Sequence, residues 1–341
     1  MTVSASGEVR RDCLEILQGR EGSLSALRGG TVLITGGTGF IGCWTAEMLA
    51  ALNDEHSFGV SILLLARNVD KFRKLWPHLA GRQDIQFIQT DIRNVVDLSG
   101  RIDWVIHAAS TEDKRFNASS PLESMSIIAD GTAALLRAIE HCSNLKKILN
   151  VSSGLVYGVQ PREMERISED YQGTPQLGSA SSAYAEAKRY TEIYCAAAWS
   201  QRKLPIMTAR PFTFLGPYQP LEGPWAMNDF IRDGLRANVI RIVGDGSTVR
   251  SFLYGSDVGF WLLRMLAEGI PGRSYNIGSP NGIALKDLAP LVAACIHPRP
   301  EVRINPAGVG SIHGSRFVPD VTLAMNSLGL SVTVPLETAI D

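Results

Sequence analysis

Tyr184 and Lys188 stand four residues apart in the segment SAYAEAK, whose composition predicts a helix. At that spacing both side chains lie on one helix face. A lysine ammonium beside a phenol favours the phenolate, which prepares the tyrosine to take or give a proton. Ser153, in VSSGLVYG, supplies a hydroxyl that could hold a substrate oxygen during this transfer. Each residue alone is more often structural, so the surrounding elements must be considered.

Six short apolar runs alternate with helix-length segments from Thr31 onward. Runs of this kind predict parallel strands buried by helices on both faces, which is a doubly wound α/β (Rossmann) sheet. Ser153 then lies at the carboxyl end of a strand, where the active sites of such sheets open. The runs are residues 31–35, 60–66, 85–89, 104–109, 147–153 and 205–210, and the strongest helical patterns are 39–52, 121–142 and 182–202.

A glycine-rich turn, TGGTGFIG, joins the first predicted strand to its helix. Its glycines let the backbone approach a dinucleotide pyrophosphate, and the helix N-terminus supplies N–H groups and partial positive charge. The position after the first buried strand favours a nucleotide over an ordinary turn. The expected cofactor contacts in this turn are Gly36, Gly39, Phe40, Ile41 and Gly42.

The end of the second predicted strand carries Arg67 and no acidic residue before Asp70. An acid here accepts from the ribose 2′-hydroxyl of NAD, whereas an arginine suits the 2′-phosphate of NADP. The expected cofactor is therefore NAD or NADP, with NADP slightly favoured by Arg67. The alternative is that Arg67 is a solvated residue at a strand end.

Proline and glycine become frequent after about residue 211, where the regular alternation stops. We therefore expect an N-terminal extension (1–30), a NAD(P)-binding Rossmann domain (31–210) and a smaller C-terminal substrate-binding lobe (211–341) interleaved with the sheet. Residues 8–28 read as a short amphipathic helix followed by a connector.

The composition excludes several classes of function. With 33 Lys and Arg against 34 Asp and Glu, no charge excess favours a nucleic acid or an anionic membrane as partner. Five scattered cysteines argue against a disulfide framework and a zinc site, so no metal and a cytoplasmic location are expected. No run approaches the roughly 20 apolar residues needed to cross a bilayer.

Four motifs, TGGTGFIG, HAAS, VSSGLVYG and YAEAK, closely resemble those of the extended short-chain dehydrogenase/reductases, in the nucleotide-sugar epimerase/dehydratase branch. The resemblance covers residues 31 to 335. It implies a nucleoside-diphosphate sugar as substrate, catalytic roles for Ser153, Tyr184 and Lys188, and a homodimer formed by the helices around 121–142 and 182–202. The further cofactor contacts that it implies are Asp91, Ile92, Ala108, Ala109, Ser110 and Pro211, together with Tyr184 and Lys188.

The resemblance also extends to the substrate end. Arg250 and Arg316 match arginines that meet the substrate diphosphate, and two guanidinium forks suit that group. Where related enzymes place a phosphate-binding asparagine before the dipeptide FI, this chain has Asp229, with Asn228 one position earlier. A carboxylate beside a diphosphate is unfavourable. Either Asn228 replaces the missing amide, or the nucleotide sits differently.

Gly154 and Leu155 restrict the chemistry. Family members that eliminate water have an aspartate and a glutamate at these two positions, and decarboxylating members keep the glutamate. Glycine and leucine can neither protonate a leaving hydroxyl nor take the C5 proton. Dehydration is disfavoured unless a carboxylate arrives from elsewhere, such as Glu112, Asp113 or Glu123.

Reactions that need only hydride transfer and one proton carrier remain. We expect an NAD(P)-dependent nucleotide-sugar epimerase working through a transient keto-sugar, with Tyr184 as acid and base. The alternative is an NADPH-dependent reductase of a nucleotide 4-keto-6-deoxy sugar, and a dehydratase or decarboxylase fits less well. A non-enzymatic cofactor-binding scaffold is the remaining alternative, because fold alone does not determine function.

Overall fold

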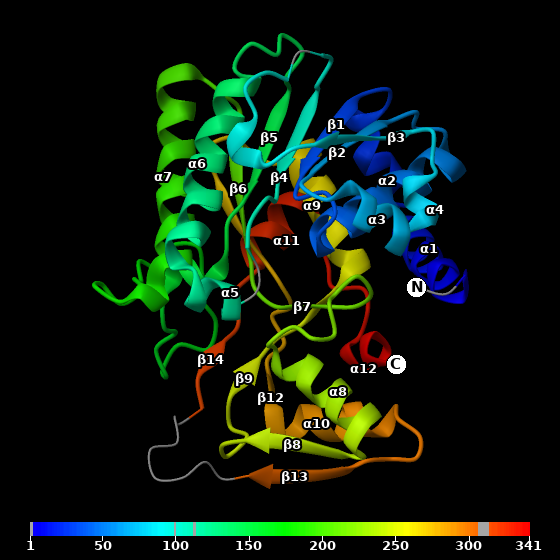
Figure 1. Cartoon of the computed structure of the whole chain (residues 1–341), viewed down its shortest axis with the longest axis vertical. Helices are drawn as coiled ribbons and strands as arrows, with labels where there is room; N and C mark the ends of the chain where they lie inside the picture. The colour runs from blue at the N-terminus through cyan, green and yellow to red at the C-terminus, as the bar shows by residue number, and fades with distance from the viewer. Residues whose placement is uncertain (1–2, 99, 112–113, 306–313) are drawn as a thin grey trace.

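The computed structural model describes residues 3–98, 100–111, 114–305 and 314–341. Seven strands pair in parallel in one sheet, in the order β11-β6-β5-β4-β1-β2-β3 (Figure 1). This confirms the doubly wound α/β sheet predicted from the apolar runs. The strands are β1 (Thr31–Thr35), β2 (Ser61–Ala66), β3 (Ile85–Gln89), β4 (Trp104–His107), β5 (Lys147–Val151), β6 (Ile206–Pro211) and β11 (Ser274–Ile277).

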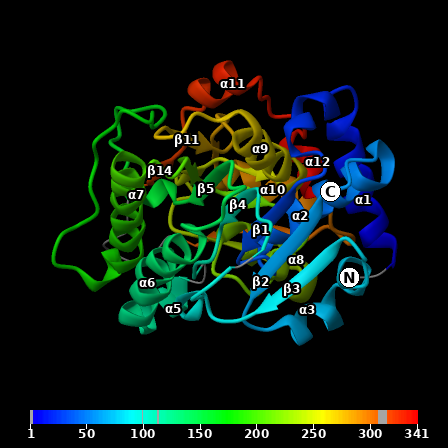
Figure 2. The ribbon, with the colours of Figure 1, turned by 90° about the horizontal axis from the view of Figure 1, so that it is seen from above.

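Helices cover both faces of the sheet. Successive side chains of a strand point to opposite faces, so each strand contributes apolar residues to both helical layers. In β1, Val32 and Ile34 join the core made with α2 and α9, whereas Leu33 joins the core made with α6 and α7. Figure 2 shows these helix pairs on opposite sides of the sheet. The helices around the sheet are α2 (Phe40–His56), α3 (Val69–Leu75), α4 (Pro77–Ala80), η2 (Ile92–Asn94), α5 (Lys114–Ser119), α6 (Pro121–Ile139), η3 (Gly154–Tyr157), η4 (Ala180–Ser182), α7 (Ala183–Arg202), α9 (Gly255–Glu268) and α11 (Thr322–Leu328).

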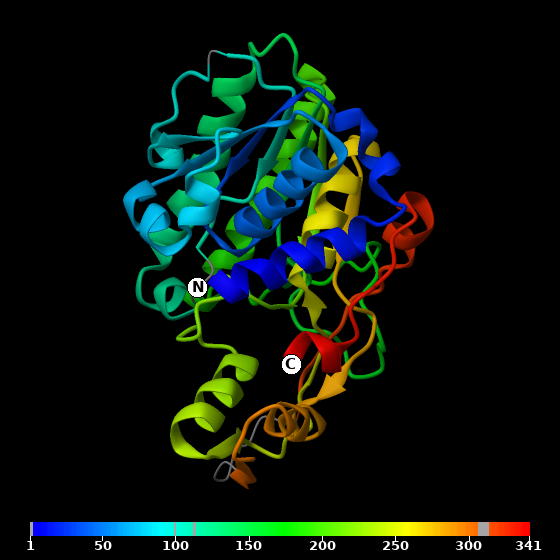
Figure 3. The same ribbon diagram turned by 90° about the vertical axis from the view of Figure 1, so that its right-hand side faces the viewer.

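The N-terminal segment forms the helix α1 (Val3–Leu17) and the 3-10 helix η1 (Glu21–Leu27). The helix begins before residue 8, where the prediction placed its start. Val9, Cys13 and Leu17 are fully buried against the main core, and Figure 3 shows α1 lying across the α2 side of the molecule.

The C-terminal lobe has an apolar core of its own, with Phe230, Ile240 and Leu288 at its centre. It lies below the sheet in Figure 1. Between segments of the lobe, the chain returns to the main sheet through α9 and β11. The short strand β11 was not predicted. The remaining elements are β7 (Phe214–Leu215), α8 (Ala226–Ala237), β8 (Val239–Val243), β9 (Val249–Arg250), β10 (Leu253–Tyr254), β12 (Ile283–Ala284), α10 (Leu285–Ala294), β13 (Glu301–Asn305), β14 (Arg316–Phe317) and α12 (Leu336–Ile340).

Two central strands end earlier than predicted. The ladder between β4 and β5 closes with the pair His107 and Asn150, and β5 ends one residue later. Ala108, Ala109 and Ser153 therefore lie in the loops beyond the sheet edge, where ligands bind in this fold. No helix among the described residues is long and apolar enough to cross a membrane. The described His, Cys, Asp and Glu residues contain no group of three that could hold a metal ion.

Candidate active site

Ser153 follows β5 and begins the 3-10 helix η3. Its backbone is extended, and its Oγ accepts a hydrogen bond from the Leu155 N–H at 3.1 Å. The side chain is buried, with 7% exposed. A hydroxyl that accepts one bond still carries a proton that it can donate. Ser153 is therefore oriented by the backbone and keeps a donor for a substrate oxygen.

Lys188 connects α7 to the end of β5. Its Nζ donates to the Val151 carbonyl at 2.7 Å, and its side chain is 4% exposed. Because Val151 lies two residues before Ser153, this bond brings α7 to the serine. The Lys188 Nζ lies 6.0 Å from the centre of the Tyr184 ring, one helical turn away. The structure thus places all three predicted catalytic residues at one edge of the sheet.

The glycine turn packs against the loop after β4. Gly36 has φ +66°, and a Cβ added there would lie 2.7 Å from the Ala108 carbonyl oxygen and 2.9 Å from the Ala109 Cα. A Cβ at Gly42 would lie 2.5 Å from Gly37. Gly39 precedes α2 without a side-chain cap, so the helix leaves its first N–H groups to other acceptors. These features fit a dinucleotide pyrophosphate.

Ser110 adds a second observation that fits a cofactor. Its Oγ is buried and has no hydrogen-bond partner among the described residues. A buried hydroxyl without a partner is costly, and a ligand that supplies one removes this cost. Gly36, Gly39, Gly42, Ala109 and Ser110 are the residues that would hold the dinucleotide.

A directional chain of hydrogen bonds fixes the loop after β4. The Thr132 hydroxyl donates to the Ile128 carbonyl at 2.7 Å, so it can only accept from His107 Nε2, 2.9 Å away. His107 Nδ1 must then accept from the Thr35 hydroxyl at 2.7 Å, and that oxygen accepts from the Ala109 N–H at 3.2 Å. Hydrogen counting therefore determines the His107 tautomer. The HAAS motif pointed to this segment, but no role for His107 was predicted.

The buried His107 makes stability sensitive to mild acid. Burial, with a smaller contribution from the Lys188 charge, lowers the pKa of His107 from 6.5 to about 3. The unfolded chain binds this proton at higher pH than the folded protein does. The stabilising contribution is therefore complete above about pH 6.5 and is lost as pH falls towards 3, by up to about 1.4 kcal/mol per pH unit.

Urea denaturation at pH 6.5, 5.5 and 5.0 checks this prediction. We expect the free energy of unfolding of the wild type to fall more steeply over this window than that of His107→Gln. Equal slopes for the two proteins would contradict the assignment. Asp91 contributes little in this window, because both its unfolded pKa of 3.8 and its folded pKa of about 2 lie below pH 5.

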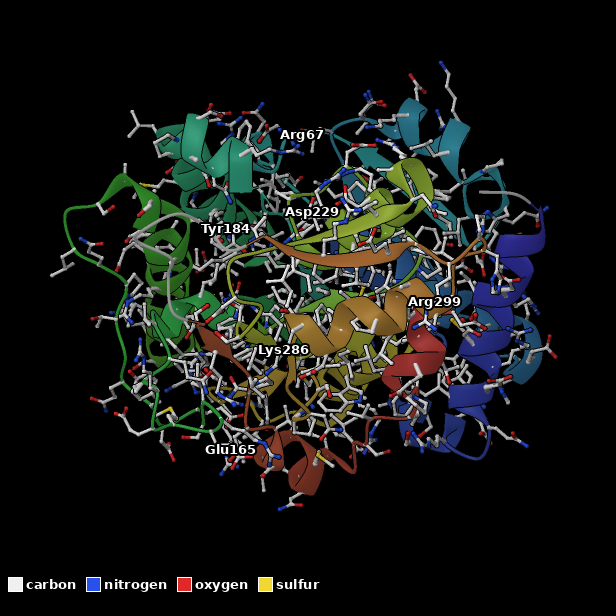
Figure 4. The ribbon with its side chains drawn as sticks, turned by 90° about the horizontal axis from the view of Figure 1, so that it is seen from below. Arg67, Glu165, Tyr184, Asp229, Lys286 and Arg299 are labelled. Carbon is white, nitrogen blue, oxygen red and sulfur yellow. The ribbon has the colours of Figure 1, made fainter. Side chains whose placement is uncertain are left out.

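The adenosine end of the expected site lies at the ends of β2 and β3. Arg93 donates from its backbone N, Nε and Nη2 to the Asp91 carboxylate at 2.8–2.9 Å. These bonds, the Arg93 side chain foremost, lower the pKa of Asp91 to about 2. Arg67 is exposed after β2, and no described carboxylate lies within ion-pair distance of it. Figure 4 shows Arg67 at the rim of the molecule, at a distance from Tyr184 in that view.

The substitution Arg67→Asp tests the expected NADP preference. We expect the ratio of the NADPH and NADH dissociation constants to move towards NADH by about tenfold or more, since a charge-assisted hydrogen bond contributes about 1.5–3 kcal/mol. Arg73→Asp is the matched control, because Arg73 is an exposed arginine nearby on α3. Fluorescence titration with both cofactors measures the ratio, and an unchanged ratio would show that Arg67 is a solvated residue only.

The structure ties the Asn228 side chain to the backbone of the lobe. Its Nδ2 donates to the Pro220 carbonyl at 2.7 Å, and the side chain is 3% exposed. It lines a cavity of about 760 Å³ with residues of α1 and α12, a cavity that Ser153 and Tyr184 do not line. The neighbouring Asp229, labelled in Figure 4, is half exposed. It forms an ion pair with Arg232, which neutralises its charge.

The two arginines expected at the diphosphate lie on different faces of a small sheet. In the parallel pair of β14 with β9, Phe317 is in register with Arg250, and Arg316 with Val249. Because successive side chains alternate, Arg250 shares a face with Phe317 rather than with Arg316. The structure therefore does not bring the two guanidinium groups together on one strand face.

Arg250 nevertheless has the environment of an anion-binding residue. Burial lowers the pKa of its guanidinium. Its donors reach the Val249 carbonyl and the carbonyl and Oγ of Ser315 at 2.8–3.0 Å, and no described carboxylate forms an ion pair with it. A partly buried cation without a carboxylate is stabilised by an anionic ligand.

Of the three candidate replacement carboxylates, the structure describes only Glu123. Glu123 forms an ion pair with Arg93 at 2.9 Å. Glu112 and Asp113 lie outside the described residues. A Cβ on Gly154 would lie 2.8–2.9 Å from the rings of Phe212 and Phe317, so an acidic side chain has no room there.

The site combines a glycine turn suited to a dinucleotide with a Ser, Tyr and Lys set at the carboxyl edge of a Rossmann sheet. This combination is typical of a dinucleotide-dependent enzyme. The chain belongs to the NAD dependent epimerase/dehydratase family, whose model matches residues 32–278. This confirms the resemblance seen in the four motifs. The family is named for NAD-dependent enzymes, so a dinucleotide is the cofactor that membership implies.

Curated relatives and solved structures agree with this placement. UDP-glucuronic acid decarboxylase 1 from Danio rerio is 26% identical over 314 residues, which cover 91% of this chain and 71% of the relative. UDP-glucuronic acid decarboxylase 6 from Arabidopsis thaliana is 27% identical over 90% of this chain and 85% of its own. The epimerase Mth375 from Methanothermobacter thermautotrophicus has a TM-score of 0.79 at 20% identity, covering 94% and 92%. The UDP-glucuronic acid 4-epimerase from Bacillus cereus has a TM-score of 0.75 at 24% identity, covering 91% and 96%. The solved structures establish a shared fold.

Proposed function

We propose that this chain is an NAD(P)-dependent epimerase of a nucleoside-diphosphate sugar that works through a transient keto-sugar. The observation that carries the proposal is the combination of Ser153, Tyr184 and Lys188 at one sheet edge with no acid at Gly154 or Leu155. This set can move one proton at a hydroxyl. It lacks the second acid and base that elimination requires.

The residues divide the work as follows. Ser153 donates its remaining proton to the sugar oxygen and holds it beside Tyr184. Tyr184 takes the hydroxyl proton when the carbon is oxidised and returns it when the ketone is reduced on its other face. Lys188, held by the Val151 carbonyl, keeps positive charge near the tyrosine. A dinucleotide held by Gly36, Gly39, Gly42 and Ser110 would supply the hydride acceptor that this reaction needs.

The substrate is proposed to span from Ser153 to the lobe formed by residues 211–341. Arg250 would bind its diphosphate, because it is partly buried and has no carboxylate among its described partners. The relatives named for UDP-glucuronic acid support a nucleoside diphosphate as part of the ligand.

Cofactor balance tests the reaction. The protein, loaded with a substoichiometric amount of NAD or NADP, is incubated with UDP- and dTDP-hexoses. We expect many equivalents of sugar nucleotide to be converted to an epimer without net change in absorbance at 340 nm. Conversion that stops at one equivalent of cofactor would contradict epimerisation.

A reductase of a nucleotide keto-sugar is the second candidate, and Arg67 favours it. An exposed arginine at the end of β2, without an acid for the ribose hydroxyls, suits NADPH as a consumed substrate. This reaction is supported if NADPH is consumed stoichiometrically with a 4-keto sugar and no cofactor-neutral epimerisation is observed.

We also propose that the chain forms a homodimer through α6 and α7. Leu122 and Met125 on α6, and Tyr190 and Ile193 on α7, are 38–82% exposed. The two members of each pair are three residues apart and share a helix face. Light scattering should give a mass of about twice 37.0 kDa, and Ile193→Asp should lower it towards one chain. A single-chain mass for the wild type would contradict the dimer.

A further inference from the structure

Two aromatic rings form a wall beside the catalytic serine. Phe212 and Phe317 stack with their ring centres 4.4 Å apart and an interplanar angle of 29°. A methyl group on Gly154, the residue directly after Ser153, would lie 2.8 Å from the Phe317 ring and 2.9 Å from the Phe212 ring. The rings therefore cover the backbone immediately next to the hydroxyl that holds the substrate.

The main sheet and the lobe each hold one ring in place. Phe212 follows β6, and its N–H donates to the Ile277 carbonyl of β11 at 2.9 Å. Tyr157 lies behind it, with ring centres 6.3 Å apart. Phe317 comes from β14. One ring of the wall is therefore held by the main sheet and the other by the lobe.

The wall runs towards the arginine proposed to bind the diphosphate. Phe317 is in register with Arg250 and shares its strand face, while the Arg250 guanidinium is turned back to Ser315. A sugar whose hydroxyl is at Ser153 and whose phosphate is at Arg250 must therefore pass along Phe317. This step rests on the proposed function.

No side chain of the wall carries a hydrogen-bond donor or acceptor. Phe212 and Phe317 are hydrocarbon, and so is the adjacent Leu155, which is 40% exposed. These rings offer a carboxylate no hydrogen bond, whereas a methyl group gains from the contact. In a hexopyranosyl diphosphate, only C5 carries an exocyclic carbon, and it lies next to the C4 hydroxyl.

We infer that the Phe212–Phe317 pair selects a nucleoside-diphosphate 6-deoxyhexose, with its C4 hydroxyl at Ser153 and its C5 methyl group on the rings, over a hexuronic acid. A carboxylate substituent at C5 would need polar side chains around it. In this chain, an aromatic stack takes their place. The inferred preference differs from the substrate for which the relatives are named, UDP-glucuronic acid.

A matched ligand series tests the inference. The cofactor-loaded wild-type protein is titrated by calorimetry with the 6-deoxyglucose, glucose and glucuronic acid forms of both UDP- and dTDP-sugars. We expect the 6-deoxy sugar to bind a few-fold more tightly than glucose, and about 100-fold more tightly than glucuronic acid, in the better nucleotide series. Equal or tighter binding of glucuronic acid would overturn the inference.

A pair of variants assigns the effect to the wall. Phe317→Arg should improve the affinity for glucuronic acid relative to 6-deoxyglucose by about tenfold or more, because it places a cation on the Arg250 face. Phe317→Leu, which keeps an apolar surface, should preserve the wild-type ranking. An unchanged ranking in folded Phe317→Arg protein would show that the wall does not select the substituent.

Binding and turnover separate this inference from the proposed function. If the ranking holds but no sugar nucleotide is turned over, the epimerase proposal fails and the specificity stands. If turnover occurs with the ranking reversed, the specificity alone fails. Failure of all six ligands to bind would overturn both.

Discussion

Replacing Tyr184 with phenylalanine should reduce turnover by about 10²- to 10⁴-fold, the usual contribution of a positioned proton carrier. The substitution removes only the hydroxyl, and Lys188 still bonds the Val151 carbonyl. We therefore expect substrate binding and thermal stability to change little. Steady-state kinetics, calorimetric binding and thermal unfolding of the variant measure these three quantities.

Tyr190→Phe is the matched control, because Tyr190 lies on the same helix and is 50% exposed. It should retain wild-type turnover. If Tyr184→Phe retained full turnover of every accepted sugar nucleotide, the catalytic assignment would be wrong. If the wild-type protein binds the cofactor but turns over no sugar nucleotide, the scaffold alternative is supported.

Replacing Gly36 with alanine should weaken cofactor binding strongly. The new Cβ would lie 2.7 Å from the Ala108 carbonyl oxygen and 2.9 Å from the Ala109 Cα, so the loop after β4 must move. A shift of about 1 Å in a positioned group can cost about 100-fold. We expect a loss of this size in the affinity for NAD and NADP, measured by fluorescence titration.

Gly29→Ala separates this contact from backbone strain. Gly29 also has a positive φ, +62°, but a Cβ there would meet nothing within 4 Å. Both variants carry the conformational cost of an alanine in the left-handed region, about 1–2 kcal/mol. Only Gly36→Ala should lose cofactor affinity. Equal affinities in the two variants would contradict the role of the packed turn.

Local patterns in the chain were sufficient for much of the architecture and part of the site. The apolar runs predicted the parallel sheet because strands buried on both faces have no polar residues to interrupt them. The four-residue spacing predicted that Tyr184 and Lys188 share a face, because the helix has 3.6 residues per turn. The strand β11 was missed, since its residues SYNI include two polar side chains and form no apolar run.

Contacts between distant segments determined the rest. The bond from Lys188 to the Val151 carbonyl joins residues 37 positions apart, and the Phe212–Phe317 stack joins residues that no local period relates. The register of β14 with β9 placed Phe317, not Arg316, beside Arg250. A shift of one residue reverses every side chain in a strand. The sequence therefore determined which residue types and local spacings are present, and only the tertiary structure decided which side chains face the same ligand, because register and packing depend on the whole fold.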